Sequence, residues 1–292
     1  MPRTSDDRAP VPTLEAALRA LRDGQSASGT PLPVLTLDQT HDLARRYGCA
    51  MREVEWQALS AGLAPLRYER NLGTVGLAGQ ARLLRATVAV VGCGGLGGWV
   101  IEGLARMGAG HLIIVDADVF AESNLNRQLG CLESTLGQSK ARCLADRVHA
   151  VNGAIEVTAH VTRLREDNAA MLLDGAEVVV DALDSIADRL VLARTLAALG
   201  LPLIHGAVGG FAGQVMTIMP GDPGLEALYS GATVPLRGVE TELGNPAATP
   251  MMIASWQVQE VVKLLVGEGE LIRNRLLVLD AEYGDVTEIR LS

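Results

Sequence analysis

The sequence predicts an α/β fold with a mostly parallel sheet, helices on both of its faces, antiparallel strands near the carboxyl end and a small helical extension at the amino end. Apolar segments of strand length alternate with segments whose apolar residues recur at helical spacing, which is typical of a parallel sheet covered on both faces. The apolar run Thr87–Val91 leads directly into a glycine cluster and then into a helical segment. A strand, a tight glycine turn and a helix in this order begin a Rossmann-like sheet.

The glycine cluster contains Gly92, Gly94, Gly95, Gly97 and Gly98. Backbone without Cβ atoms can approach a phosphate closely, and the free N–H groups at the start of the following helix favour an anion. We therefore expect a nucleotide at this turn. A glycine-rich turn without a ligand stays the alternative at this point, because a lone motif of this kind is a weak signal.

The first part of the chain differs from the rest. Prolines punctuate a charged start, and Pro65 ends the segment. We expect residues 1–66 to form a helical extension and residues 67–292 to form one nucleotide-binding domain. Apolar residues at helical spacing around Leu18 predict a first short helix in the extension.

Two further helices are expected in this extension. Thr36 or Asp38 can cap the first of them, which ends at Gly48, and the second begins at Met51. Two helices joined at a glycine resemble a DNA-binding helix-turn-helix. A helical hairpin that packs on the main domain or on a partner is the better interpretation, because the second helix carries no basic stripe.

The second strand of the main domain is predicted at His111–Asp116, so the first carboxylate after the glycine turn lies at a strand end. An acidic side chain about twenty residues after the glycines can accept hydrogen bonds from ribose hydroxyls, which strengthens the nucleotide hypothesis. A polar loop follows, too dense in hydrogen-bonding groups for a plain connector. Its polar residues are Asp118, Ser123, Asn124, Asn126, Arg127 and Gln128.

A helix opens near Gly137 and carries Lys140 in its first turn. A cation there opposes the helix dipole, so its position suggests a compensating anion. An ordinary solvated lysine is the alternative.

The remaining strands and helices continue the alternation. The third strand is predicted at Ile155–Val161 and the fourth at Ala176–Asp181. Carboxylates at the carboxyl ends of parallel strands line the ligand crevice, so we expect Asp181 and Asp184 there. After them we expect the helix Ile186–Leu199, the strands Pro202–Ala207 and Gly213–Met219, the helix Met251–Val266, and the strands Leu276–Asp280 and Val286–Leu291. Residues 220–249 break all periodicity, and we expect a loop that crosses the nucleotide site.

Composition excludes several classes of protein. The net charge of −9 argues against a nucleic-acid or acidic-membrane partner, because both need clustered positive charge. No run reaches the roughly eighteen apolar residues of a membrane span, and the start lacks the apolar core of a signal peptide, so we expect a cytoplasmic protein. The four cysteines include no CxxC pair, which predicts free thiols without a disulfide framework.

From Leu66 to Ser292 the sequence resembles the HesA/MoeB/ThiF family. Members of this family are adenylyltransferases, similar to ubiquitin-activating enzymes, that activate the C-terminal glycine of ubiquitin-fold sulfur-carrier proteins. The SNLNRQ loop followed by GQSK is the most specific part of the likeness, since an NAD-linked oxidoreductase has no reason to place these residues in this order. The other matching stretches are RYERN, VGCGGLGG, VDADVFAE, DALDS, the HGA segment at His205 and WQVQEVVKLLVG.

The resemblance implies ATP and Mg²⁺ as ligands and assigns roles to individual residues. The residues implied in catalysis are Arg70, Asn124, Arg127, Gln128, Lys140 and Asp184, of which Asp184 holds magnesium and Arg127 and Lys140 hold phosphates. Those implied in nucleotide binding are Gly92, Gly94, Gly95, Gly97, Asp116, Asp118, Ser123 and Ser185, with Asp116 at the ribose.

Arg70 resembles the arginine that reaches into the partner subunit's site in this family, which implies a homodimer. From the residues alone it is a surface charge. The chain has Asn71 where the family often has glutamine, a departure that leaves the arginine in place.

Two further departures concern cysteine. Paired CxxC motifs bind structural zinc in many members, but this chain has none, so we expect no zinc. Thr241 stands about where several members carry an acyl-accepting or persulfide cysteine, which implies that chemistry stops at the adenylate. We expect Cys131 to be the most accessible of the thiols at Cys93, Cys131 and Cys143.

The expected reaction joins two anions. A carboxylate oxygen attacks the α-phosphorus of ATP and yields an acyl adenylate and pyrophosphate, so positioning and charge neutralisation matter more than a protein base or nucleophile. The sequence leaves open a carrier of the molybdopterin, tungstopterin or thiamine type. The alternatives are ATP-dependent dehydration of a tRNA-bound carboxylate, an NAD-linked oxidoreductase and an enzymatically silent binding protein.

Overall fold

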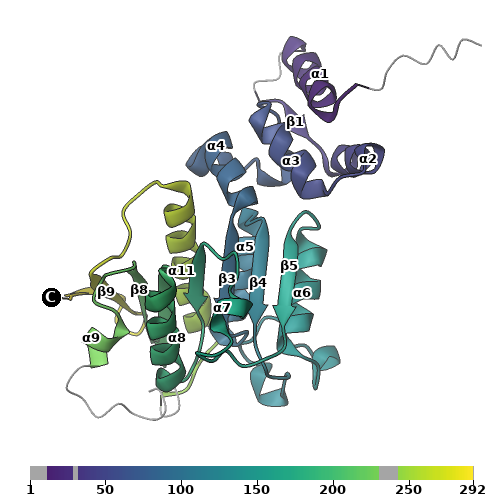
Figure 1. Cartoon of the computed structure of the whole chain (residues 1–292). Coiled ribbons are helices and arrows are strands. Elements are labelled where there is room, and N and C mark those ends of the chain that lie inside the picture. The colour runs from purple at the N-terminus through teal and green to yellow at the C-terminus, as the bar shows by residue number, and fades with distance from the viewer. Residues whose placement is uncertain (1–11, 29–31, 230–242, 292) are drawn as a thin grey trace, which may run out of the picture. The chain divides into compact units, whose positions relative to one another are not determined.

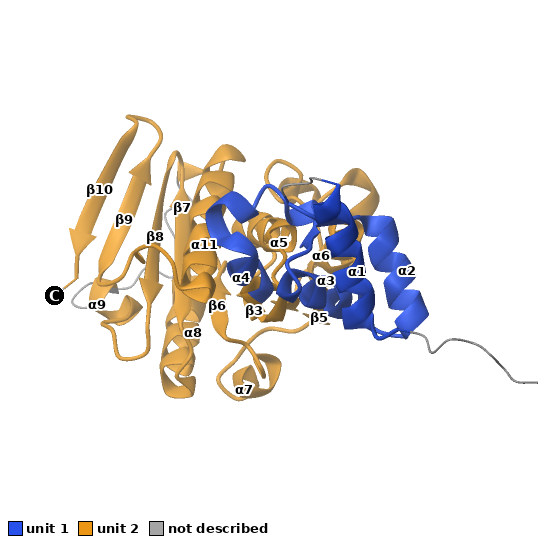
Figure 2. Ribbon diagram, turned by 90° about the horizontal axis from the view of Figure 1, so that it is seen from above, with its two compact units in different colours: residues 1–81 blue, residues 82–292 orange. Residues whose placement is uncertain are grey.

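The computed structural model describes residues 12–28, 32–229 and 243–291. The chain divides into two compact units, Met1–Ala81 and Arg82–Ser292, which are coloured blue and orange in Figure 2. The functional boundary that we expect between residues 66 and 67 stays a prediction.

The first unit contains the three helices that the sequence predicts, α1 (Leu14–Ala27), α2 (Leu37–Tyr47) and α3 (Met51–Ser60). Thr36 caps α2 because its hydroxyl accepts a hydrogen bond from the Gln39 N–H, and the Gln39 side chain in turn accepts one from the Thr36 N–H. These helices enclose a small core of Leu18, Leu35, Leu43, Val54, Ala58 and Leu63.

Other elements of this unit escaped sequence analysis. The strands β1 (Val34–Leu35) and β2 (Ala64–Pro65) pair in parallel, but two residues are too few to produce a recognisable pattern. The turn η1 (Leu66–Tyr68) precedes the helix α4 (Leu72–Arg85), whose backbone leaves helical geometry at Gly76 with φ of 64°. Glycine is a poor helix former, so the glycines in this segment give it a low helix propensity, and α4 was not predicted.

The second unit is built on an eight-stranded sheet in the order β10-β9-β8-β7-β6-β3-β4-β5. The strands from β7 to β5 in this order are parallel to one another, and β8, β9 and β10 extend the sheet in antiparallel fashion, which confirms the predicted fold class. Their bounds are β3 (Thr87–Val91), β4 (His111–Val115), β5 (Glu156–His160), β6 (Val178–Asp181), β7 (Leu203–Gly209), β8 (Ala212–Ile218), β9 (Arg275–Asp280) and β10 (Asp285–Arg290).

Helices cover both faces of this sheet (Figures 1 and 2). The helices α5 (Gly95–Met107), α6 (Lys140–Val151) and α11 (Ala248–Val266) pack on one face. On the other lie α7 (Ala169–Leu172) and α8 (Ile186–Leu199), whose leucines join alternate strand residues in a second core. None of the helices within the described ranges is long and apolar enough to cross a membrane.

The segment 220–249 corrects one expectation. Part of it is helical, because α9 (Leu225–Tyr229) lies within it and α11 begins at Ala248. Leu225 is fully buried in the core beside α8, which holds this short helix in place although it is too brief to produce a periodic pattern. Thr241 lies outside the described residues.

Candidate functional site

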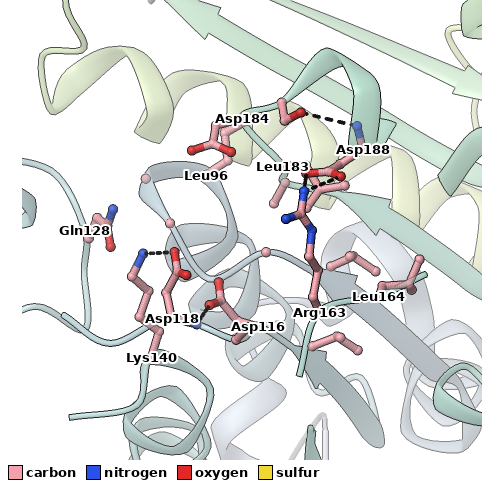
Figure 3. Close-up of a pocket in the computed structure, with 18 of the residues that line it drawn as sticks. Leu96, Asp116, Asp118, Gln128, Lys140, Arg163, Leu164, Leu183, Asp184 and Asp188 are labelled. Atoms are coloured by element: carbon pink, nitrogen blue, oxygen red, sulfur yellow. Dashed lines mark hydrogen bonds and ion pairs between the residues drawn. The ribbon is translucent and has the colours of Figure 1, made fainter. Parts of the chain in front are cut away.

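A cavity of about 760 Å³ opens at the carboxyl ends of β3, β4 and β6 (Figure 3). The central strand β3 pairs with β4 on one side and with β6 on the other. After β3 the chain adds β4 and β5 on the first side, and it then crosses over to add β6 and β7 on the second side. Such a switch in strand order leaves a crevice between the loops, where open α/β sheets bind ligands. The topology therefore places the glycine turn at the expected binding edge.

The glycines of this turn serve two different purposes. A Cβ atom at Gly97 would lie 1.8 Å from the carbonyl oxygen of Gly92, so Gly97 is required for the turn to close and does not line the cavity. Gly92 has φ of +99°, and a Cβ atom there would lie 2.5 Å from the Ala182 carbonyl oxygen. Gly92 lines the cavity together with Gly94 and Gly95, which lie at the start of α5, where no side chain caps the helix. The open N–H groups there favour an anion.

Asp116 joins the glycine turn to the end of β4. Its carboxylate accepts hydrogen bonds from the N–H of Cys93 at 2.6 Å and of Asp118 at 2.7 Å, one on each oxygen. Burial raises the pKa of Asp116, and these two N–H donors act against that rise. Each oxygen keeps a lone pair for a hydroxyl of a ligand.

Lys140 has the compensating anion that its position in the helix suggests. It is the first residue of α6, its side chain is only 8% exposed, and its Nζ lies 3.1 Å from the carboxylate of Asp118. The Asp118 side chain is 70% exposed. Figure 3 shows both side chains in the cavity, on the same side of Asp116. A desolvated cation thus faces the cavity with a partner that can move into water.

Besides Asp118, the polar loop after β4 contributes three residues of the predicted site to the cavity wall, Ser123, Arg127 and Gln128. Asn124 is not among the lining residues. Its side-chain oxygen accepts a hydrogen bond from the Ala121 N–H at 3.0 Å and so shapes the turn η2 (Glu122–Asn124). Its contribution within the described structure is to hold the loop that presents its neighbours.

The side chains of Arg127 and Gln128 differ in whether their polar atoms have hydrogen-bond partners. The Arg127 guanidinium donates to the Ser123 carbonyl at 3.1 Å and to the Asn126 side chain at 2.7 Å. Gln128 is 7% exposed, yet its side-chain oxygen has no hydrogen-bond partner among the described residues. A buried polar atom without a partner costs free energy, so this oxygen marks a place where a ligand donor or a bound water fits.

Asp181 does not line the cavity, which corrects the expectation that it does so with Asp184. It is fully buried and accepts a hydrogen bond from His205 at 2.7 Å and another from the Leu183 N–H at 3.0 Å. Burial lowers the pKa of His205 below its ordinary value, although the Asp181 carboxylate acts in the opposite direction. This pair belongs to the interior of the sheet.

Asp184 and Ser185 do line the cavity, at the turn between β6 and α8. Ser185 caps α8 by accepting a hydrogen bond from the Asp188 N–H at 3.3 Å. Asp184 is exposed and labelled at the edge of the cavity in Figure 3. Within the described ranges, no group of three or more His, Cys, Asp and Glu side chains is arranged to hold a metal ion.

One wall of the cavity was not predicted from the sequence. Arg163 and Leu164 follow β5, and Asp188 lies in the first turn of α8. One nitrogen of Arg163 donates to both carboxylate oxygens of Asp188 at 2.7 Å (Figure 3). The signal was present in the sequence, because these residues come directly after the third predicted strand, at the same edge as Asp116.

Neither Arg70 nor a cysteine is among the described residues that line the cavity. Arg70 belongs to the first unit, is exposed and forms no ion pair with the residues that the structure describes. Cys93 is buried. The expectation for Cys131 is wrong, because it is only 5% exposed and its thiol contacts the Ala121 carbonyl, whereas Cys143 is partly exposed.

Known proteins resemble this chain in sequence and in fold. The ThiF family model matches residues 68–292. SAMP-activating enzyme E1 of Haloferax volcanii is 38% identical over 221 residues, which are 74% of this chain and 81% of that protein. The sulfur carrier protein adenylyltransferase of Thermus thermophilus is 34% identical over 224 residues, which are 74% of this chain and 83% of that protein.

Among solved structures, E. coli MccB with ATP has a TM-score of 0.69 at 19% identity and covers 77% of this chain and 72% of its own. At that identity the likeness concerns the fold alone. The match of the family model and the identity to SAMP-activating enzyme E1 together establish that this chain belongs to the ThiF family.

Proposed function

We propose that this chain adenylates the C-terminal glycine carboxylate of a ubiquitin-fold sulfur-carrier protein, with ATP as the donor and pyrophosphate as the product. The observation that carries the proposal is the cavity at the switch point, which gathers a desolvated lysine, an arginine and an uncapped helix start around one end. The names of the two relatives, a SAMP-activating enzyme and a sulfur carrier protein adenylyltransferase, support the same activity.

The cationic end of the cavity receives the triphosphate. Lys140 exchanges its exposed partner Asp118 for a phosphate oxygen, and Arg127 lies beside the start of α5, where its Cδ would be 3.6 Å from a Cβ placed on Gly95. These charges let an anionic carboxylate approach an anionic triphosphate. Positioning and charge neutralisation supply most of the catalysis in phosphorus transfer, and a carboxylate ionised at neutral pH needs no protein base.

Asp116 binds the ribose hydroxyls, because both of its oxygens are fixed by backbone N–H groups and still have lone pairs to offer. Gln128 orients a water beside the phosphates, because its unpaired oxygen accepts a hydrogen bond from that water. Ser123 and Ser185 complete the polar lining. Asn124 acts indirectly, through the loop that it holds together.

Asp184 fits a magnesium ion that arrives with ATP. Mg²⁺ usually keeps several waters and binds one or two carboxylates together with the phosphates, so a single exposed carboxylate at the cavity edge is sufficient. Bound there, the ion would neutralise developing charge on the phosphate oxygens. We also propose that the protein binds no structural zinc.

Chemistry on this chain stops at the acyl adenylate. No cysteine is among the residues that line the cavity within the described structure, and burial raises the pKa of both Cys93 and Cys131. A buried protonated thiol is a poor nucleophile. The next step therefore takes place on a separate molecule, whose sulfur nucleophile attacks the acyl carbon of the adenylate and releases AMP.

We further propose that the protein is a cytoplasmic homodimer in which Arg70 supplies a cation to the partner subunit's nucleotide site. The support is that Arg70 is exposed and has no ion-pair partner among the described residues of its own chain. An exposed guanidinium without a counter-charge is free to bind a phosphate.

Calorimetric titration tests this proposal. We expect the purified protein to bind ATP with magnesium and not to bind NAD. Binding of NAD with no response to ATP would point instead to an oxidoreductase. Exchange of pyrophosphate into ATP that depends on a tRNA carboxylate, and not on a carrier protein, would favour the dehydratase.

A further inference from the structure

The cavity has a second end that the proposed phosphate site leaves empty. Arg163 and Leu164 come from the loop after β5, Leu183 comes from the turn between β6 and α8, and Asp188 comes from the first turn of α8. In Figure 3, Asp116 lies between this group and Lys140 with its partner Asp118. The two ends of the cavity therefore differ in character, one cationic and the other made of two leucines and one ion pair.

The order of groups along a nucleotide determines what reaches this second end. If the proposed function holds, the phosphates lie at the glycine turn and the ribose lies at Asp116, so the base extends beyond Asp116. A base is planar, with apolar faces and polar edges. Leu164 and Leu183 supply apolar surface for one of those faces.

Arg163 is held in one orientation. Its carbonyl accepts a hydrogen bond from Asn168 at 3.0 Å, and its guanidinium nitrogen contacts both oxygens of Asp188 at 2.7 Å. Asp188 itself is fixed because its N–H is bonded to the Ser185 cap. Arg163 is thus held at its backbone carbonyl by Asn168 and at its guanidinium by Asp188.

Fold stability gives little reason for this ion pair. The Arg163 side chain is 66% exposed, and exposed ion pairs contribute little to stability. The neighbouring pair of Arg165 and Asp167 is similarly exposed, but neither residue lines the cavity. What distinguishes Arg163 is the flat, solvent-facing guanidinium that it presents to the cavity.

We propose that the guanidinium of Arg163, oriented by Asp188, stacks on the nucleobase and, together with the leucines, forms the base site. Planar guanidinium groups stack on aromatic rings, and a stacked contact tolerates different bases because every base has a π-face. Asp188 is a positioning residue. The contact adds to the affinity for any nucleoside triphosphate without reading the polar edge of the base.

The contact is also remote from the α-phosphorus. A base held equally in the ground state and in the transition state changes KM and leaves kcat alone. The stacked guanidinium makes a cation–π contact with the base, so loss of Arg163 should weaken ATP binding by about tenfold.

Calorimetry with two ligands tests this inference. We expect Arg163→Ala to bind ATP about tenfold more weakly than the unsubstituted protein and to bind inorganic tripolyphosphate, which has no base, within about twofold of it. Arg163→Lys keeps the charge but loses the plane, so it should also bind ATP more weakly. Asp188→Asn frees the guanidinium and should show a smaller loss. Arg165→Ala is the matched control and should bind both ligands normally.

Each result has one meaning. If the unsubstituted protein binds no ATP, the proposed function fails as a whole. If it binds ATP and Arg163→Ala binds equally well, the ion pair is an ordinary surface contact and only this inference is overturned. Equal weakening of ATP and tripolyphosphate, or full ATP affinity in Arg163→Lys, would show that Arg163 acts through its charge and not through stacking. A loss of kcat with unchanged KM would also overturn the inference.

Discussion

Two glycines of the phosphate turn, two residues apart, should respond to alanine in opposite ways. At Gly97 an added Cβ would lie 1.8 Å from the Gly92 oxygen and 2.8 Å from its carbonyl carbon. Because nonbonded heavy atoms pack at about 3.5–4 Å, the turn would have to shift by roughly 1–2 Å. Overpacking costs about 1–3 kcal/mol, and a backbone obstacle cannot rotate away, so we expect the free energy of unfolding to fall by about 3 kcal/mol.

At Gly95 the nearest atoms to an added Cβ are the side chains of Pro250 at 3.5 Å and Arg127 at 3.6 Å, which is ordinary contact. Alanine is the better helix former, so the free energy of unfolding should be unchanged or should rise by up to about 1 kcal/mol. The methyl group would nevertheless occupy the cavity where a phosphate approaches the helix start, and ATP binding should weaken strongly.

Urea unfolding and calorimetric ATP titration of both variants check this pair of expectations. The contrast is the informative result, because a general softening of the turn would lower stability and affinity together. Normal ATP affinity in Gly95→Ala would refute the placement of phosphate at the start of α5. Normal stability in Gly97→Ala would refute the packing argument.

Three further predictions concern pH, assembly and metal. Burial lowers the folded-state pKa of His205, so its contribution to stability is complete above about pH 6.5 and falls as the pH drops below that value, because the unfolded chain takes up the proton first. The free energy of unfolding of His205→Asn should therefore fall less steeply with decreasing pH, and equal slopes would contradict the argument. Arg70→Ala and Asp184→Ala should each be inactive in ATP–pyrophosphate exchange, and refolding the two together should restore activity if Arg70 acts in the partner's site; confirmed mixed dimers without activity would exclude this. Metal analysis of the purified protein should find no stoichiometric zinc, and one zinc per chain would reveal an unrecognised site.

The parts of the fold that sequence analysis predicted correctly are those whose signals are local. The β-branched run before Gly92 forms β3, and helix α8 has the predicted bounds Ile186–Leu199. The helix α4 was not predicted because its glycines give the segment a low helix propensity and its backbone leaves helical geometry at Gly76. The two-residue strands β1 and β2 are too short for periodicity to detect.

For the cavity, too, the residues with a local sequence signal were predicted and those that depend on tertiary contacts were not. Asp116, Lys140 and Asp184 lie where strand ends and helix starts are expected, and all three line the cavity. The contact of Arg163 with Asp188 joins residues 25 positions apart, so only the folded sheet brings them together. Burial is likewise a tertiary property, which is why the exposure of Cys131 was misjudged.

Whether a carrier protein's C-terminal carboxylate is the acceptor can be measured directly by ATP–pyrophosphate exchange. We expect exchange in the presence of a ubiquitin-fold sulfur carrier and none with the same carrier lacking its terminal glycine.

Lys140→Met removes the desolvated phosphate cation and should reduce exchange by about 100-fold or more, whereas Arg142→Met, on the exposed face of the same helix, should not. Exchange that persists without the terminal glycine, or that is equally fast in Lys140→Met, would contradict the proposed adenylation of a carrier at this cavity.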